Sequence, residues 1–526
     1  MQILKRTMAI LLVLCFIALT LIGCAKKQTS SDKQNGATNA PSGSVDDEQT
    51  QRPTNEYGEE SFTNFVPVDD LDFEEEELTI LLRDTKISSR EWTKESPEDE
   101  LDEAVAMRNA AVEDALNLVI DYEFVAYANY DAFASEFNNM ILQDIKDQYH
   151  YYDIAANFAY CGAYTIVRDC ASNLLDVEAF PFFNFDLPCW NQAIVKNTTI
   201  NGRLHYVSGD VNLTLFDAAL VIWYNKTLYD EYAEPTDPEN IQLLALEGKW
   251  TYDELYRWAD RLYADSNGTQ GRQADDTYGL SLARYSHTMD SLPYAWDLEF
   301  LINNPDGTHE FNILGNNKAE EAFTKVNDLI ETNGNWQSPS VGNFAAGCYV
   351  FWPATIYPSE DANMTIREMN DKYGLLPMPK YTPDQEQYGT TTQDFYTLMT
   401  VLDHSESPVT TKGKAISAYL QFMTEESYTS VRGYYFNRII KPKYFGTDDS
   451  EGTVSNSIAL FDIIVDNIEF EYWTVYSAQL NNIAWLWRDS FRDFVPSLEA
   501  GFKAKADAYD AAIKSTDAWL GLRDAE

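Results

Sequence analysis

The alternation of strand-like and helix-like segments between residues 78 and 156 constrains the fold more than any other feature of this chain. Three strand-like runs stand at 78–82, 118–125 and 152–156. One helical pattern follows the first run, with Ser96 as its expected cap and Pro97 in its first turn, and a second occupies 132–145. Strand, helix, strand, helix, strand is typical of a parallel sheet with helices on both faces.

The second half of the chain repeats this pattern. Further strand-like runs stand at 204–207 and 219–223, and further helices are expected around 323–330, 416–423 and 458–465. Thr251–Glu254 has the form of a capping box, and the helix behind it places Leu255, Trp258 and Leu262 on one buried face. Asn317 is expected to cap the helix that contains Phe323. We therefore predict an α/β protein with two lobes.

The N-terminus has the pattern of an exported protein. Lys5 and Arg6 precede an almost unbroken apolar stretch from Met8 to Ile22. This is typical of a secretory signal peptide, and the stretch is shorter than the ~20 residues that cross a bilayer. The ending Leu21–Cys24 resembles the lipobox of bacterial lipoproteins, which implies a signal peptide at 1–23 and a diacylglyceryl group on the Cys24 sulfur. The alternative is an ordinary signal peptide with a chance cysteine.

Residues 24–76 are predicted to comprise the lipidated cysteine and a disordered tether. The stretch 26–53 is rich in Ser, Thr, Gln, Asn, Gly and Asp, and its only β-branched aliphatic residue is Val45. Such a composition cannot bury enough apolar surface to fold. We expect the protein on the extracytoplasmic face of the cell membrane, with the lipid anchor as its only membrane contact.

The charge balance excludes several classes of partner. The chain has 84 acidic and 38 basic residues, a formal net charge of −46. Such a field repels nucleic acid and anionic lipid headgroups, so we expect no nucleic-acid partner. The cysteines that remain after Cys24 match no zinc pattern and are expected to be buried free thiols, although an exported chain can form disulfides; they are Cys161, Cys170, Cys189 and Cys348.

Motifs for catalysis or cofactors are weak in this sequence. The five histidines have no metal-ligand spacing, and no HExxH, GxSxG or phosphate-binding glycine loop occurs. We therefore predict no metal, no cofactor and no enzyme activity. Paired carboxylates can serve a glycosidase, and Asp153 and Asp297 are the candidates for that alternative.

Aromatic residues are a stronger signal, with 12 Trp, 33 Tyr and 27 Phe. A flat aromatic ring can stack against the apolar face of a sugar, and neighbouring polar side chains can then bind the hydroxyls. Five tryptophans stand where loops are expected, although each alone is more often part of a core: Trp190, Trp296, Trp352, Trp485 and Trp487.

Several segments together resemble one known family. They are Met107–Asn109 with Val112–Glu113, Phe185–Gln192, Asn201–Tyr206 with Gly209–Asp210, Trp223–Lys226, Gly248–Thr251, Tyr278–Leu280, Tyr373–Lys380, Ser427–Tyr428 and Phe461–Ile464. In this order, behind a lipobox, they resemble the extracellular solute-binding lipoproteins of bacterial ABC transporters, in the maltose-type sugar-binding class. The similarity is greatest to a branch common in clostridia and related Firmicutes.

The resemblance implies a periplasmic-binding-protein-like fold with a hinge and a ligand cleft between the lobes. Each lobe would have a mainly parallel sheet flanked by helices. The first lobe would comprise 77–200 and 377–434, and the second 201–376 and 435–526. Ligands of open parallel sheets bind beyond the carboxyl ends of the strands, which agrees with a cleft site.

By position in the family pattern, ten residues are expected to contact the ligand. From the second lobe these are Trp352, Trp485, Trp296, Asp297 and Tyr285. From the first lobe they are Asp84, Trp92, Asn157, Asp394 and Phe395.

The resemblance implies a monomeric binding protein that captures a small solute outside the cell. The expected cargo is a mono- or oligosaccharide, and the expected partners are permease subunits driven by a separate ATPase. Peptides and polyamines are other possible cargoes. Two other functions stay open: a surface glycan hydrolase or lyase, and a ligand-sensing lipoprotein without a transport role.

Overall fold

The computed structural model describes residues 64–85, 90–93, 97–126, 130–162, 170–357, 365–402, 412–441, 445 and 452–522, without the side chains of 130–133 and 161–162. The chain divides into two units, Met1–Gln51 and Arg52–Glu526, and all of the described residues belong to the second. The predicted signal peptide, Cys24, the tether as far as residue 63 and the expected cap Ser96 lie outside them. No helix within the described ranges has both the length and the apolar character needed to cross a bilayer.

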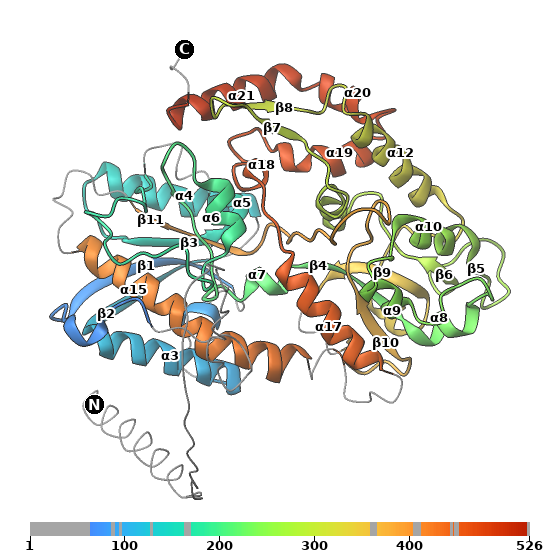
Figure 1. The fold of residues 1–526 in the computed structure, drawn as a ribbon, viewed down its shortest axis with the longest axis horizontal. Coiled ribbons are helices and arrows are strands. Elements are labelled where there is room, and N and C mark those ends of the chain that lie inside the picture. The colour runs from blue at the N-terminus through green and yellow to red at the C-terminus, as the bar shows by residue number, and fades with distance from the viewer. Residues whose placement is uncertain are drawn as a thin grey trace, which may run out of the picture. The chain divides into compact units, whose positions relative to one another are not determined.

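The first lobe is built on a four-stranded sheet with the order β11-β3-β1-β2 (Figure 1). Its strands are β1 (Glu76–Asp84), β2 (Leu118–Ala126), β3 (Ile154–Phe158) and β11 (Thr397–Val401). Strand β1 pairs in parallel with β2 and β3, and β11 is antiparallel to β3. The flanking helices are α3 (Glu100–Leu116), α4 (Tyr130–Lys146) and α15 (Lys412–Glu426).

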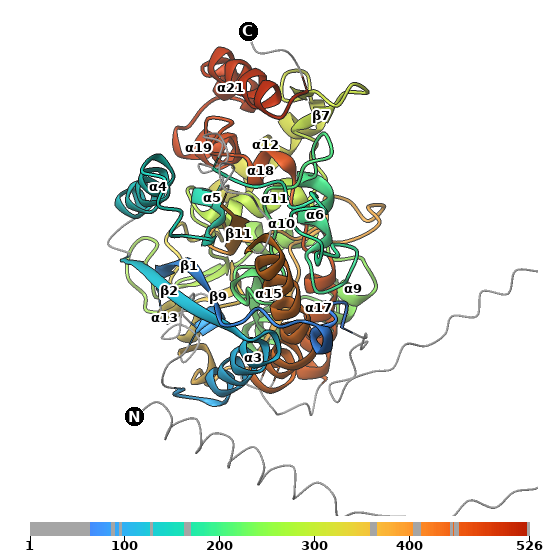
Figure 2. The same cartoon turned by 90° about the vertical axis from the view of Figure 1, so that its left-hand side faces the viewer.

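Helices cover both faces of this first sheet, as the alternation in sequence predicts. Ile80 and Leu82 belong to a buried cluster with residues of α3 and α15. Leu81 points the other way and clusters with Phe137 and Ile141 of α4. The view at right angles shows α3 and α4 on opposite sides of β1 and β2 (Figure 2).

The start and end of α3 explain how a helix passes directly into a strand. Its N-cap is Asp99, whose Oδ1 accepts hydrogen bonds from the backbone N–H groups of Leu101 and Asp102, each at 3.0 Å. At its other end Asn117 has a left-handed conformation with φ of 51°. Because this conformation ends a helix in one residue, β2 begins at Leu118 without a loop.

The second lobe is built on a five-stranded sheet with the order β10-β4-β9-β6-β5. Its strands are β4 (Leu220–Asn225), β5 (Tyr263–Ala264), β6 (Thr277–Leu280), β9 (Tyr349–Thr355) and β10 (Tyr373–Leu376). Only β6 and β9 pair in parallel, and the other pairs are antiparallel. The α/β fold in two lobes is therefore confirmed, but the second sheet is mixed and not mainly parallel. Strand β4 runs against its neighbours β9 and β10 on both sides, so β10 has the same direction as β9.

Helices surround this second sheet and connect its strands. They are α8 (Lys226–Tyr232), α9 (Ile241–Leu246), α10 (Tyr252–Arg261), α12 (Asn317–Glu331), α13 (Val341–Ala345) and α17 (Thr453–Asp466). The cap of α12 is Asn316, one residue before the predicted Asn317. Thr251 begins α10 but makes no side-chain capping bond, so the predicted capping box does not form. The predicted strand at 204–207 makes only an isolated bridge between Val207 and Met399.

A largely helical region, which combines residues 287–311 with residues 472–519 near the C-terminus, packs on the second lobe (Figure 1). It comprises α11 (Leu292–Ala295), the hairpin of β7 (Leu301–Asn303) and β8 (His309–Phe311), α18 (Tyr472–Val475), α19 (Leu486–Arg492), α20 (Leu498–Lys503), α21 (Ala506–Trp519) and the 3-10 turns η3 (His287–Ser291) and η6 (Ile483–Trp485). Helix α20 contacts α12, and α19 contacts η3. These contacts hold η6 beside the second lobe.

Several segments cross between the lobes. One carries the short helix α7 (Thr214–Asp217), and another, at 377–396, lies beside it through a bridge between Ala219 and Thr392. A third continues from α15 as two π-helical stretches, η4 (Ser427–Arg432) and η5 (Tyr435–Ile440). π-helical turns inside α-helices occur frequently at functional sites, and η4 and η5 lie in one of the segments that cross between the lobes.

The chain joins the first lobe earlier than residue 77. The backbone N–H of Phe65 donates to the Glu425 carboxyl at 3.1 Å, and the Asn64 side chain donates to Glu426 at 3.1 Å. Val66 is buried in the same cluster as β1 and α15. Residues 64–76 are therefore packed against the body, and the predicted tether ends no later than residue 63, because Val66 finds an apolar surface on α15.

Cys189 and Cys348 are buried free thiols, as predicted, and the Cys170 side chain is also buried. The side chain of Cys161 lies outside the described atoms.

Candidate ligand-binding site

A cavity of about 810 Å³ lies between the two lobes, and we call it the interlobe cavity. It is lined by Arg83, Thr85, Phe158, Thr214, Ala283, Tyr285, Ser286, His287, Gln337, Ser338, Pro339, Tyr357, Gln393, Asp394, Phe395, Trp485 and Arg488.

The strand directions explain why the cavity forms here. Arg83 lies at the carboxyl end of β1, and Phe158 ends β3. In the second lobe, Tyr357 follows the carboxyl end of β9, and Ala283 follows that of β6. Loops beyond the carboxyl ends of strands are the usual ligand sites of α/β sheets. Here those edges of both sheets face one space.

Arg83 provides a fixed cation in the wall of the interlobe cavity. Its guanidinium lies 3.7 Å from the centre of the Phe158 ring. Its Nη1 donates to the Phe395 carbonyl at 2.7 Å, and its Nη2 donates to Thr397 Oγ1 at 3.0 Å. The side chain is 1% exposed, so its orientation is set by the protein before any ligand binds.

A buried carboxyl supports this arginine from behind. Thr397 Oγ1 donates to Glu91 Oε2 at 2.7 Å, and the backbone N–H of Thr214 donates to the other carboxyl oxygen. Burial raises the pKa of Glu91, and the Arg83 charge opposes that rise. Glu91 therefore links the first sheet to the crossing segment that contains Thr214.

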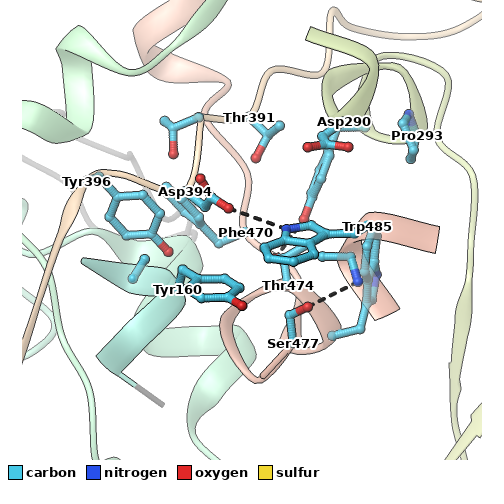
Figure 3. A pocket seen from close by; sticks show the side chains of 15 residues that line it. Tyr160, Asp290, Pro293, Thr391, Asp394, Tyr396, Phe470, Thr474, Ser477 and Trp485 are labelled. Atoms are coloured by element: carbon cyan, nitrogen blue, oxygen red, sulfur yellow. Dashed lines mark hydrogen bonds between the residues drawn. The ribbon is translucent and has the colours of Figure 1, made fainter. Parts of the chain in front are cut away.

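Trp485 lies at the end of η6, and its ring stacks on Tyr160 of α5 (Ala159–Gly162). The ring centroids are 4.7 Å apart and the planes differ by 2°. The indole Nε1–H donates to Asp394 Oδ2 at 3.4 Å (Figure 3). Because Tyr160 follows β3 and Trp485 belongs to the C-terminal region, this stack connects the two sides of the cavity.

Arg488 lies one helical turn beyond Trp485. Its guanidinium is 5.1 Å from the Trp485 ring and 5.8 Å from the Tyr285 ring. Its Nη1 donates to Asp290 Oδ2 at 2.7 Å. Burial raises the pKa of Asp290 well above its usual value, and Arg488 opposes that rise. Arg488 is therefore a second cation in the wall of the interlobe cavity, and Asp290 fixes its position.

His287 has solvent-accessible surface in the interlobe cavity, but the surrounding walls displace much of the water around it. This desolvation lowers the pKa of the imidazole, while the Asp394 charge raises it and Arg488 lowers it further. The ring is therefore uncharged at neutral pH and can both donate and accept hydrogen bonds.

A second, enclosed cavity adjoins the first and shares Trp485 and Asp394 with it; we call it the inner chamber. Its volume is about 50 Å³. It is lined by Ala159, Tyr160, Asp290, Pro293, Tyr294, Thr391, Thr392, Asp394, Tyr396, Phe470, Trp473, Thr474, Ser477, Ala484 and Trp485 (Figure 3).

Four of the ten predicted ligand residues line the interlobe cavity. They are Trp485, Tyr285, Asp394 and Phe395.

Three predicted tryptophans are instead parts of hydrophobic cores. Trp352 lies within β9, opposite Trp223, and packs against Phe344. Trp296 is fully buried, and its Nε1–H donates to the Pro379 carbonyl at 3.0 Å. Trp92 is buried in the first lobe. None of the three lines the interlobe cavity, because each ring is surrounded by apolar side chains of its own lobe.

The other three predicted residues also lie outside the lining of the interlobe cavity. Asp84 is exposed at the end of β1, and Asn157 is buried in β3, where its Oδ1 accepts from the backbone N–H of Phe158. Asp297 lines a separate cavity of about 350 Å³ with Glu469 and Glu471.

The two carboxyls considered for a glycosidase are also separated by the fold. Asp153 precedes β3, at the opposite end of that strand from Phe158, and it pairs with Lys412 at 2.9 Å. Burial raises the pKa of Asp153 to about 6, while Lys412 opposes the rise. Neither Asp153 nor Asp297 lines the interlobe cavity.

Sequence reasoning missed several residues of the wall, chiefly Arg83, Tyr160, Asp290, His287 and Arg488. For two of these residues, the position in the sequence next to a predicted ligand residue could have indicated a role in the site. Arg83 directly precedes Asp84, which was predicted, and Arg488 is three residues after Trp485.

The sequence matches no protein-family model, and no curated protein matches it. Solved structures do match its fold. The sugar-binding protein MalE of Xanthomonas citri has a TM-score of 0.54 at 12% identity, over 85% of this chain and 100% of that one. The fold is that of a two-lobe periplasmic binding protein.

Two further solved structures agree. An ABC transporter associated binding protein of B. animalis subsp. lactis, in complex with beta-1,6-galactobiose, has a TM-score of 0.52 at 13% identity, over 84% of this chain and 98% of that one. The cyclic alpha-maltosyl-1,6-maltose binding protein of Arthrobacter globiformis has a TM-score of 0.51 at 15% identity, over 85% and 99%. At these identities the likeness concerns the fold.

Proposed function

We propose that this protein is the substrate-binding component of an ABC importer and that it captures a saccharide in the interlobe cavity. The observation that carries the proposal is the cavity itself, where the carboxyl ends of strands in both lobes meet beside the Trp485 ring. Proteins of the same fold are described as sugar-binding, one of them in complex with a galactobiose.

The chemistry of the wall suits a sugar. Trp485, Tyr285, Tyr357 and Phe158 provide rings that can pack on C–H faces. Arg83, Arg488, His287, Gln337, Gln393 and Asp394 provide hydrogen-bond donors and acceptors for hydroxyls. A wall that combines rings with fixed polar groups suits a ligand that, like a sugar, has both C–H faces and hydroxyls.

Ligand binding would be coupled to closure of the lobes. A ligand that contacts both lobes makes more contacts in the closed state than in the open one, so it shifts the population toward closure. The closed form would dock on permease subunits, and ATP hydrolysis would belong to a separate subunit.

A thermal-shift and calorimetry screen of the purified protein tests this function. The panel contains mono- and oligosaccharides, peptides and polyamines. We expect a saccharide to raise the melting temperature and to bind with a measurable Kd. Stabilisation only by peptides or polyamines would reject the sugar assignment, and release of reducing ends from a glycan would identify an enzyme instead.

The location of the protein at the membrane is a separate part of the proposal. Diacylation of Cys24 would hold the body at the membrane, because two acyl chains give stable anchoring and one does not. Cells that express Cys24→Ser should release the protein into the medium, whereas the natural chain should stay with the membrane fraction. A Cys24→Ser protein that remains on washed cells would remove the lipid anchor from this account.

A further inference from the structure

The side chains of Trp485 and Asp394 separate the inner chamber from the interlobe cavity. Tyr160 lines only the inner chamber, Arg488 lines only the interlobe cavity, and Trp485 and Asp394 line both. The Trp485 indole, bonded to Asp394, is therefore the partition between them (Figure 3). At about 50 Å³ the chamber can hold water but is too small for a sugar ring.

The chamber has polar groups that the described chain does not satisfy. Thr392 is 7% exposed, and its Oγ1 is buried without a hydrogen-bond partner among the described residues. The same holds for Asp290 Oδ1, the carboxyl oxygen that does not bind Arg488. Leaving a buried polar group unpaired is unfavourable, so such groups commonly serve a ligand or ordered water.

Other polar side chains of the chamber already have partners. Thr391 Oγ1 donates to the Glu469 carbonyl at 3.1 Å, and Ser477 Oγ accepts from the backbone N–H of Ala484 at 3.1 Å. Among the chamber's fully buried side-chain nitrogen and oxygen atoms in the described residues, Thr392 Oγ1 and Asp290 Oδ1 lack a hydrogen-bond partner, and a hydroxyl-bearing ligand could satisfy both.

The Tyr160–Trp485 stack closes the chamber in this structure. Parallel rings at 4.7 Å between centroids leave no space for another group between them. A ligand that stacks equally well on Trp485 can replace the interaction between the two rings. Both rings belong to short elements, a four-residue helix and a three-residue turn, and Asn481 and Asn482 before Trp485 have φ of 56° and 61°.

We propose that the inner chamber is a second sugar subsite, closed by the Tyr160–Trp485 stack until the ligand displaces Tyr160. One saccharide unit would lie in the interlobe cavity beside Arg488 and Tyr285. The next unit would take the place of Tyr160 on the Trp485 ring and bond to Thr392 and Asp290. The protein would then prefer saccharides of two or more units to monosaccharides. This inference depends on the proposed function, because it assigns a subsite of the same cleft.

Calorimetry with matched saccharide series tests the proposal. The probes are the mono-, di- and trisaccharides of glucose, galactose, xylose and mannose. In the natural protein, di- or trisaccharides of the bound series should bind at least ~10-fold more tightly than the monosaccharide.

The decisive variant is Thr392→Val, which keeps the side-chain shape and removes the hydroxyl. We expect it to weaken disaccharide binding ~5- to 10-fold, in line with a lost hydrogen bond, and to leave monosaccharide binding unchanged. Thr390→Val is the matched control, since Thr390 Oγ1 is also buried and unpartnered among the described residues but does not line the chamber. Tyr160→Ala should strengthen disaccharide binding, because the ligand no longer displaces a ring.

The outcomes separate this proposal from the proposed function. If no saccharide binds, the sugar function and the subsite both fail. If saccharides bind but the monosaccharide binds as tightly as its oligomers, the subsite is wrong and the function stands. A Thr392→Val effect that is absent, or equal for all chain lengths, also overturns the subsite. Thermal unfolding of each variant checks that the fold is intact.

Discussion

Aromatic side chains in the core of the second lobe and in the wall of the interlobe cavity differ in what surrounds them. In the core, Trp258 stacks on Tyr229 at 4.7 Å and contacts Phe351, and both Trp258 and Trp296 are fully buried. In the wall, Trp485 has one ring partner, Tyr160, and its Nε1–H faces Asp394. Core rings are enclosed by their own lobe, whereas the wall ring is held by groups from the other side of the cleft.

This difference predicts opposite consequences for the same substitution. Removing a core ring leaves a cavity that the surrounding structure fills only partly, so the cost is in folding. Removing a wall ring exposes surfaces that already border water, so the cost is in ligand binding. Three aromatic residues that sequence reasoning treated alike, Trp352, Trp485 and Tyr285, form a graded series in burial and test the distinction.

Trp352→Ala should have the largest effect of all, and on stability. Trp352 is 7% exposed and lies within the central strand β9. Large-to-small changes of buried aromatic residues cost ~3–5 kcal/mol, and we expect a loss of this size in the free energy of unfolding. Urea denaturation measures it. Unchanged stability together with lost ligand binding would move Trp352 from the core to the site.

Buried and exposed carboxyl groups differ in the same way as the two kinds of ring. The pH dependence of stability tests this difference at Asp217, which lies in the crossing segment. Asp217 is 5% exposed and accepts a hydrogen bond from Tyr435. Burial raises its pKa to about 7; the Tyr435 bond lowers it, Glu91 raises it and Arg90 lowers it. In the unfolded chain the value returns to about 4.

The direction of the pH effect follows from proton binding. Below pH ~4 both states hold the proton, whereas between ~4 and ~7 only the folded state holds it, so stability falls as pH rises through that window. Asp217→Asn should remove this part of the decline and make the protein more stable than the natural chain at pH 8, by up to a few kcal/mol at ~1.4 kcal/mol per pKa unit. Urea unfolding at pH 5 and 8 measures the effect.

The control for this experiment is Asp84→Asn, because Asp84 is exposed. In Asp217→Asn the free energy of unfolding should still decline somewhat as pH rises, since burial also raises the pKa of Glu425 to about 7 and that of Asp153 to about 6. Equal slopes for the natural protein and Asp217→Asn would show that Asp217 does not retain its proton on folding.

Trp485→Ala should have a smaller effect on stability and a clear effect on binding. The ring is half-buried and loses one stack and one long hydrogen bond, so we expect at most ~1 kcal/mol in unfolding free energy. For any saccharide found to bind, affinity should fall at least ~10-fold. Trp485→Phe is the matched control and should retain part of the affinity. Equal losses of stability and binding would reassign Trp485 to the core.

The first lobe was predicted well because short-range sequence patterns mark each of its strands and helices. Alternating strands and helices at 78–156 place β1, α3, β2, α4 and β3 in order. The cap of α3 is Asp99 and not Ser96, and β3 begins at Ile154, two residues later than predicted. In the second sheet, β4 pairs antiparallel with β9 and β10, two strands that follow it much later in the chain. No periodicity in the sequence indicates the direction of these strands, so the second sheet was predicted to be mainly parallel.

The site was predicted less completely for a related reason. Trp352 and Trp485 were both predicted to contact the ligand, but β9 carries Trp352 into the lobe while η6 leaves Trp485 at its surface. Which neighbours a ring meets is decided by tertiary contacts far apart in the chain, such as Tyr160 with Trp485. The tether shows the same limit, since its composition gave no sign that Val66 would find a buried place on α15.

Tyr285→Ala should have the smallest effect of these substitutions on stability and binding. It tests how far the ligand-binding part of the cavity wall extends. Its ring is 48% exposed, with Arg488 at 5.8 Å and Arg492 at 5.2 Å from the ring centre. Because so much of the ring already meets water, its removal should leave the melting temperature unchanged and weaken saccharide binding about 2- to 5-fold, in line with an exposed contact of ~0.5–1 kcal/mol. Calorimetry on Tyr285→Ala beside Trp485→Ala measures the ratio. A loss as large as that of Trp485→Ala would mean that the ligand sits near the mouth of the cavity, and it would move the main stacking platform from the partition to the rim.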